Sequence, residues 1–99
     1  MLIVAGTINV DPADVPRLRT AAALMMAATH QEPGNIEYVF SVSVADPGNV
    51  QIFEIWESAD DLEKHFTLPH MATFQSTLKE LTITSRALHR YEVASSEPM

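Results

Sequence analysis

The sequence contains no cysteine and few basic residues, and each shortage excludes a class of function. Without cysteine the chain can form no disulfide, no thiolate metal site and no cysteine nucleophile. Only 6 Lys and Arg stand against 13 Asp and Glu, which gives a formal charge of −7 and a pI near 4.8. That charge repels phosphate backbones and anionic membrane surfaces, and no basic cluster offsets it. We therefore expect neither nucleic acid nor a membrane as a partner.

Long hydrophobic runs are also absent. No segment approaches the ~20 consecutive apolar residues that a membrane helix requires. The apolar start of the chain, residues 1–4, lacks the basic region and the long apolar region of a secretory signal. We expect a soluble cytoplasmic protein.

The chain is short for the apolar surface that it carries. A domain of 99 residues buries roughly two-thirds of the surface that its unfolded chain exposes. Because 46% of the residues are apolar, a thin core gains from sharing surface with a second copy. We expect residues 1–94 to form one domain, residues 95–99 to form a flexible tail, and a homodimer to cover a sheet face such as Tyr38, Phe40 and Val42.

Hydrophobic periodicity predicts the element order βαββαβ. Short alternating segments bounded by Pro and Gly indicate strands, and apolar residues at helical spacing indicate helices. Asp11 or Asp14 can cap the first helix, and Ser58 can cap the second. Pro69 divides the second helical region into two pieces. The expected strands are 2–10, 36–44, 50–57 and 87–93. The first helix is expected to end at residue 30, and two further helical pieces are expected at 60–68 and 70–81.

The segment from Glu54 to His70 gathers two carboxylates, two imidazoles and the only Trp around one strand-to-helix junction. Alternation places Glu54 and Trp56 on the same face of their strand. A carboxylate on an inward face needs a hydrogen bond or a wet cavity. The pattern therefore indicates either a ligand pocket or one satisfied polar pair.

No sequence motif indicates a cofactor. The chain has no phosphate loop, dinucleotide fingerprint or nucleophile elbow, so neither flavin nor nicotinamide is predicted. His65 and His70 are five residues apart across Pro69, which is not the same-face spacing of a helical metal site. We expect no cofactor and no metal.

The chain carries the short motifs Glu32-Pro-Gly34, Glu54-x-Trp56, Ser58, His65 and Pro69-His70. Together with the order of elements, these motifs resemble the antibiotic biosynthesis monooxygenase (ABM) family across residues 2–93. The family's small α+β barrel proteins include cofactor-free quinol and polyphenol monooxygenases, haem-degrading enzymes, a phospho-sugar-like signal isomerase and many members of no known activity. The resemblance implies a ferredoxin-like sheet with helices on one face, two sheets meeting in a homodimer, and a pocket between each sheet and its helices.

The resulting hypothesis is a cofactor-independent monooxygenase that uses dioxygen to oxidise a small phenolic or quinol-like aromatic to a quinone. His65 would be the general base, with His70 as second choice, since an imidazole titrates near neutral pH. Asn9 would donate to the substrate oxygen, as the resemblance implies. Apolar walls would be formed by Trp56, Phe40, Phe66, Phe74 and Met71.

Each assignment has an alternative that the sequence leaves open. Trp56 can simply fill the core, Asn9 can cap a turn, and either imidazole can cap a helix or face water. For Glu54 we favour a salt bridge to Arg86 or Arg90 over a role as proton acceptor or cation ligand. Haem degradation and phosphate isomerisation are less favoured, the latter because phosphate needs cations. A non-catalytic dimeric domain that binds a small ligand or responds to stress explains the same features, so enzymatic activity itself stays open.

Overall fold

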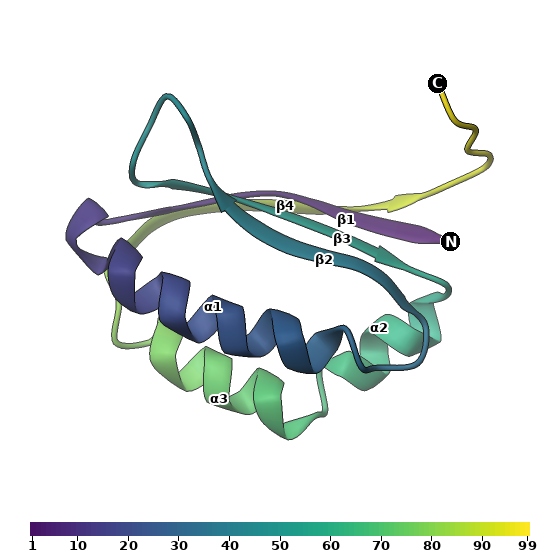
Figure 1. Cartoon of the computed structure of the whole chain (residues 1–99), viewed down its shortest axis with the longest axis horizontal. Coiled ribbons are helices and arrows are strands. Elements are labelled where there is room, and N and C mark those ends of the chain that lie inside the picture. Colours follow the sequence, from purple (N-terminus) through teal and green to yellow (C-terminus); the bar gives the residue numbers. More distant parts are fainter.

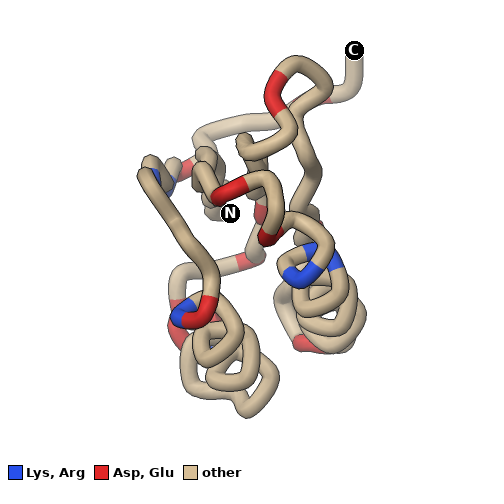
Figure 2. The backbone as a smooth tube through the Cα atoms, turned by 90° about the vertical axis from the view of Figure 1, so that its left-hand side faces the viewer, with Lys and Arg blue, Asp and Glu red and all other residues tan.

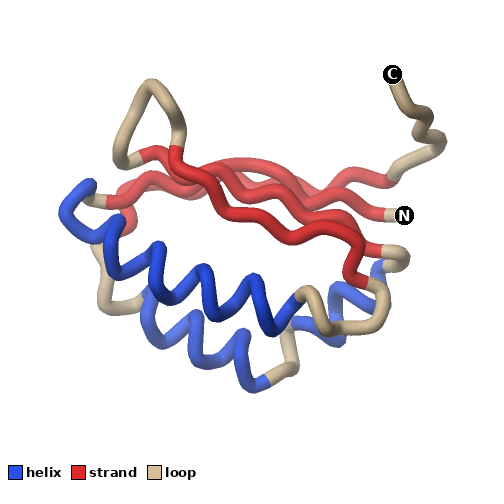
Figure 3. Tube along the Cα trace, in the orientation of Figure 1, coloured by secondary structure: helices blue, strands red, loops and turns tan.

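A computed structural model, which describes all residues from Met1 to Met99, contains one antiparallel sheet with its helices packed against one face (Figures 1 and 3). The sheet order is β2-β3-β1-β4. This is the predicted ferredoxin-like βαββαβ arrangement. The elements are β1 (Leu2–Val10), η1 (Pro12–Asp14), α1 (Val15–Thr29), β2 (Asn35–Val42), β3 (Asn49–Trp56), α2 (Ala59–His65), α3 (Pro69–Leu78) and β4 (Ile83–Glu92).

Strand alternation fixes which side chains face the helices. On β3, the residues at every second position from Val50 to Trp56 are buried. The antiparallel register aligns Tyr38 of β2 with Glu54 of β3, Glu54 with Val4 of β1, and Val4 with Arg90 of β4. These four residues form one row across the helix-facing side of the sheet, and we call it the Glu54 row.

Two of the boundaries that differ from the sequence prediction have a clear physical cause. Helix α2 ends at His65 and α3 begins at Pro69, so the proline starts the second helix instead of interrupting the first. Proline suits a first helical turn because the missing N–H would have no partner there. Strand β4 begins at Ile83, four residues before the predicted start, because Ile83–Glu92 pairs along the whole of β1. The polar residues at its start conceal this pairing from a hydrophobicity pattern.

The turn before β2 and the junction between β3 and α2 depend on two local features. Ser58 caps α2 as predicted, since its side chain accepts a hydrogen bond from the Asp61 backbone N–H at 3.2 Å. Gly34 has φ 86° and lies against the Asp61 side chain, so a larger residue would be both strained and obstructed. These contacts join the turn before β2 to the start of α2.

The face of the sheet opposite the helices is uncovered (Figure 2). The predicted dimer face was wrong in its residues, because Tyr38 and Phe40 point toward the helices and Tyr38 is 2% exposed. The uncovered face carries Val39, Phe53 and Tyr91, which are 37%, 40% and 52% exposed. No helix is both long and apolar enough to cross a membrane.

Candidate functional site

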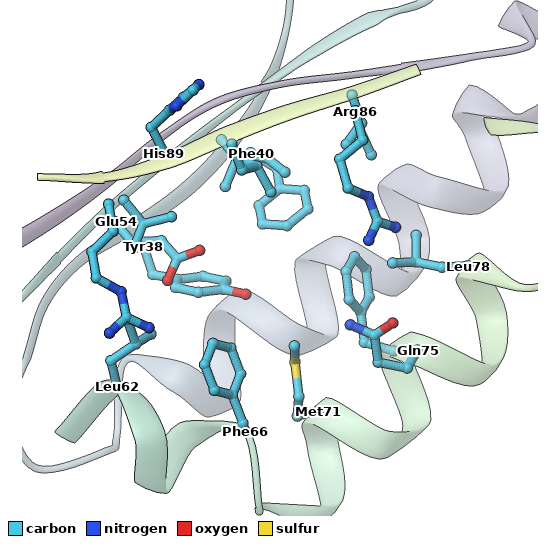
Figure 4. Close-up of a pocket in the computed structure, with 16 residues that line it drawn as sticks. Tyr38, Phe40, Glu54, Leu62, Phe66, Met71, Gln75, Leu78, Arg86 and His89 are labelled. Carbon is cyan, nitrogen blue, oxygen red and sulfur yellow. The ribbon is translucent and has the colours of Figure 1, made fainter. Parts of the chain in front are cut away.

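A cavity of about 300 Å³ lies between the sheet and helices α2 and α3 (Figure 4). Phe66 and Met71 approach it from the helices, and Phe40 approaches it from the sheet. Its lining is mostly apolar, with a few polar side chains. The lining residues are Val4, Ile8, Tyr38, Phe40, Ile52, Glu54, Leu62, Phe66, Met71, Phe74, Gln75, Leu78, Arg86, Leu88, His89 and Arg90.

Glu54 and Tyr38 are the buried ionisable residues of this lining. Figure 4 shows the Glu54 carboxylate beside the Tyr38 ring, with the Tyr38 hydroxyl directed into the cavity. Burial raises the pKa of Glu54 to about 7, and the negative charge of Glu32 adds to the rise, whereas a hydrogen bond from Trp56 opposes it. Burial, reinforced by Glu54 and Glu32, also raises the pKa of Tyr38. At neutral pH the cavity therefore holds a carboxyl group that can gain or lose a proton beside a neutral phenol.

Trp56 lies behind the cavity wall instead of in it. Its side chain is fully buried, its indole N–H donates to Glu54 Oε1 at 2.9 Å, and its ring packs against Tyr38 and His65. Of the two alternatives for the inward carboxylate, the satisfied polar pair is present, and Glu54 also faces a cavity. Trp56 thus holds the carboxylate in place.

The predicted salt bridge of Glu54 was wrong. Arg90 pairs with Glu63 of α2 at 3.1 Å, and Arg86 forms no ion pair. The sheet register explains this outcome, since Val4 separates Glu54 from Arg90 within the row. Both arginines line the cavity on the β4 side, where the sequence analysis expected no site residue.

His65 and His70 meet at a carboxylate outside the cavity lining. His65 Nδ1 lies 2.7 Å from Glu32 Oε2, and His70 Nε2 lies 2.6 Å from the same oxygen. His65 is 1% exposed and packs between Trp56 and Tyr38. The five-residue spacing speaks against a metal site only within one continuous helix, but the break before Pro69 turns both rings toward Glu32. The potential ligand atoms of all three residues lie within 4.8 Å of one another.

Asn9 belongs neither to the cavity lining nor to the cluster of Glu32, His65 and His70. It donates to Ser85 Oγ at 2.7 Å and accepts from the Asn49 side chain at 3.1 Å, at the end where β1 meets β3 and β4. The structure therefore does not bring Asn9 together with His65 or with the cavity. Its proposed contact with a substrate stays a prediction from resemblance.

Of the five residues predicted to form the apolar walls, Phe40, Phe66, Met71 and Phe74 line the cavity, whereas Trp56 does not; His70, the second choice of base, does not line it either. The sequence pattern placed Tyr38 on a dimer face and did not predict Gln75, Arg86 or Arg90 as lining residues. The signal for Tyr38 was available, because alternation places it on the same face as Phe40. The arginines had no such signal, since their place depends on the register of β4 against β1.

Solved structures share this fold closely. A candidate antibiotic biosynthesis monooxygenase from Deinococcus radiodurans is 27% identical, with a TM-score of 0.90 over 100% of this chain and 98% of its own. A candidate of the same name from Nitrosomonas europaea is 18% identical, with a TM-score of 0.88 over 96% and 100%. Rv0793 from Mycobacterium tuberculosis is 22% identical, with a TM-score of 0.86 over 98% of each chain. The last two show the fold alone.

Sequence comparison completes the assignment. The curated proteins give no match. The sequence profile described as antibiotic biosynthesis monooxygenase matches residues 1–77, from the start of the chain to α3. The match covers most of the chain and includes Glu32, Glu54, Trp56, His65 and His70. The chain therefore belongs to the antibiotic biosynthesis monooxygenase family.

Proposed function

We propose that this protein is a cofactor-independent monooxygenase that oxidises a small phenolic or quinol-like aromatic to a quinone. The observation that carries the proposal is the placement of Glu54 and Tyr38 together in a mostly apolar cavity (Figure 4). Family membership and the name of the Deinococcus radiodurans structure support a monooxygenase in general. A volume of about 300 Å³ is at the lower end for ligand pockets and suits one or two fused rings.

The reaction requires only the substrate, dioxygen and a place for a proton. A base removes the phenolic proton, and the phenolate transfers one electron to dioxygen. The resulting phenoxyl radical and superoxide combine at a ring carbon to form a carbon–oxygen bond. Loss of water from the protonated peroxide gives the quinone, so a phenol and O₂ yield a quinone and H₂O. The substrate supplies all four electrons that reduce dioxygen, and the protein contributes proton transfer, orientation and exclusion of water.

Glu54 is the residue best placed to accept the phenolic proton. A simple phenol has a pKa near 10, and Glu54 has a pKa of about 7, so proton transfer is unfavourable by about 4 kcal/mol unless the phenolate is stabilised. The neutral Tyr38 hydroxyl can donate a hydrogen bond to the phenolate oxygen, because its own raised pKa keeps it protonated. Polyphenols, which ionise more readily, are therefore the favoured substrates.

The aromatic walls would orient a flat ring against these two groups. Phe40 and Phe74 meet edge to face with ring centroids 5.4 Å apart, and Tyr38 lies 5.7 Å from Phe40. Aromatic ligands favour offset or edge-on packing against such rings. Dioxygen is apolar and enters the same environment without losing hydrogen bonds to water.

His65 remains a prediction as the general base. Its ring lies 5.3 Å from that of Tyr38 but does not line the cavity, and its Nδ1 is engaged by Glu32. This position supports an indirect role, in which His65 holds the Tyr38 and Trp56 rings in place. A direct comparison of Glu54 and His65 variants tests which of the two residues is the base.

The test measures oxygen uptake with a panel of quinols and polyphenols. We expect Glu54→Gln to lower the rate about 10²-fold or more, because a positioned base contributes in that range. Gln retains an oxygen that can accept from Trp56, so the fold should persist. Glu57→Gln, at an exposed position just beyond β3, is the matched control and should react at the wild-type rate.

Three outcomes would change the proposal. If Glu54→Gln reacts as fast as wild type whereas His65→Gln is slow, the base is His65. If the wild-type rate does not rise as the pH increases through about 7, a carboxyl group with the pKa of Glu54 is not the base. If no electron-rich aromatic supports uptake although aromatic ligands bind, the protein is a ligand-binding domain.

A further inference from the structure

Three potential metal ligands converge just outside the cavity lining, where α2 meets α3. Glu32 comes from the turn after α1, His65 is the last residue of α2, and His70 lies in the first turn of α3. Their ligand atoms lie within 4.8 Å of one another. The side chains of His65 and Glu32 are 1% and 7% exposed, whereas that of His70 is 24% exposed.

No permanently charged cation compensates the buried Glu32 carboxylate. Its ion-pair partners are the two histidines alone, and the arginines that form ion pairs are engaged by Glu80 and Glu63. A buried carboxylate is stable only when it is paired or bound to a metal ion. Two neutral imidazoles would leave this cluster with a charge of −1, near the second buried carboxyl group, Glu54.

The donor set suits a transition metal ion of borderline softness. Two imidazole nitrogens and one carboxylate oxygen are the protein ligands of several zinc sites, in which water takes the fourth position. Zinc lies ~2.0–2.1 Å from such atoms, so tetrahedral ligands are ~3.3 Å apart. The present contacts of 2.6 and 2.7 Å would have to open by well under 1 Å. The partly exposed His70, which also lines a cavity of about 160 Å³ between α1 and α3, provides an approach for the ion.

We propose that Glu32, His65 and His70 bind one Zn²⁺ or a similar divalent transition metal ion. The ion would join the turn after α1 to the α2–α3 junction and would act structurally. None of its three ligands lines the cavity of Glu54 and Tyr38, so the proposal is independent of the proposed oxidation. The competing explanation is that protons alone hold the two histidines on the carboxylate.

The experiment is metal titration of the full chain after it has been stripped with a chelator. We expect one equivalent of Zn²⁺ per chain by calorimetry, and an increase in melting temperature on addition of Zn²⁺. Co²⁺ should give the visible absorption of a four-coordinate site. Because these readouts do not depend on catalysis, failure here leaves the proposed oxidation intact, and the reverse is also true.

Substitutions of the proposed ligands test where the ion binds. His70→Ala should weaken Zn²⁺ binding at least about tenfold while circular dichroism stays unchanged, because this side chain is partly exposed. Glu32→Gln should also weaken binding, since the carboxylate charge is lost. His89→Ala is the matched control, because His89 is an exposed histidine on β4 that does not belong to the cluster of Glu32, His65 and His70, and it should bind as wild type does.

Two results would overturn the proposal. The first is the absence of saturable binding at Zn²⁺ concentrations up to about 100 μM. The second is equal affinity in wild type and in a folded His70→Ala variant. In either case, the three side chains form a hydrogen-bonded cluster that protons alone hold together.

Discussion

Replacing Glu54 by Gln should make the protein more stable at pH 8 although it removes the proposed base. Glu54 is 8% exposed, and its pKa rises from an ordinary 4.5 to about 7 mainly because burial disfavours the charged form. Glutamine is uncharged and keeps an oxygen for the indole N–H of Trp56, which now donates to Glu54 at 2.9 Å. The substitution therefore removes the cost of the charge while it preserves the hydrogen bond.

The sign and size of the effect follow from proton linkage. Between pH 4.5 and about 7 the folded chain holds a proton on Glu54 that the unfolded chain has lost, so the free energy of unfolding falls as the pH rises. Each unit of pKa difference corresponds to ~1.36 kcal/mol, which gives a total of about 3 kcal/mol. This decrease in the free energy of unfolding is absent below pH 4.5 and complete above about pH 7. It does not occur in the Glu54→Gln variant, which has no carboxyl group at this position.

The assay is urea unfolding followed by circular dichroism at several values of pH from 4.5 to 8, at one protein concentration. The free energy of the Gln variant minus that of wild type should increase by about 3 kcal/mol over this range, because all other titrating groups cancel. Glu57→Gln, which alters an exposed carboxylate, should show no such trend. A difference between Glu54→Gln and wild type that is constant from pH 4.5 to 8 would refute the raised pKa and its role in the cavity.

Three further predictions concern the Trp56 contact, the turn before β2 and the uncovered sheet face. Trp56→Phe should lower the free energy of unfolding by about 2 kcal/mol, as measured by circular dichroism in urea, because it leaves a void and removes the only donor to Glu54. Gly34→Ala should lower the melting temperature, since φ is 86° and the Asp61 side chain fills the space; a variant as stable as wild type would contradict that strain. Light scattering of the wild-type protein should give twice the chain mass of 10.9 kDa. Phe53→Asp should shift the measured mass toward that of one chain, because Phe53 lies on the uncovered face. A wild-type mass of 10.9 kDa at micromolar concentration would refute the homodimer.

Local patterns were sufficient to predict the order of elements. Period-two alternation from Val50 to Trp56 identified β3 and correctly placed Glu54 and Trp56 on its buried face. Ser58 marked the start of α2 because a side-chain oxygen can satisfy a free backbone N–H. Such features depend on residues close in sequence, so they can be recognised in a single sequence.

Partners that are distant in sequence could not be predicted in the same way. The choice between Arg86, Arg90 and Trp56 as partners of Glu54 depends on the register of three strands and on the position of Glu63 on α2. Likewise, the meeting of His65 with His70 depends on where α2 ends. Each is a consequence of tertiary packing, which single-sequence periodicity does not report.

The case of Asn9 shows where resemblance and pattern disagreed. Alternation puts Asn9 on the face opposite Ile8, and the structure has Ile8 buried against the helices. The same alternation therefore directs Asn9 away from a pocket on the helix side. Its assignment as a substrate contact came from the family resemblance alone, and the hydrogen bonds to Ser85 and Asn49 give it a structural role in this chain.

The burial of Glu54 is unfavourable for folding, and it is also informative about function. A hydrophobic side chain at position 54 would continue the apolar face formed by Val50 and Ile52, and it would carry no desolvation penalty. Instead the sheet buries a carboxyl group, provides one hydrogen bond from Trp56, and leaves its other side facing a cavity. If this carboxyl group were needed only for packing, the Gln variant would be more stable and equally active. Loss of activity together with a gain in stability would show that the buried charge serves the chemistry of the cavity.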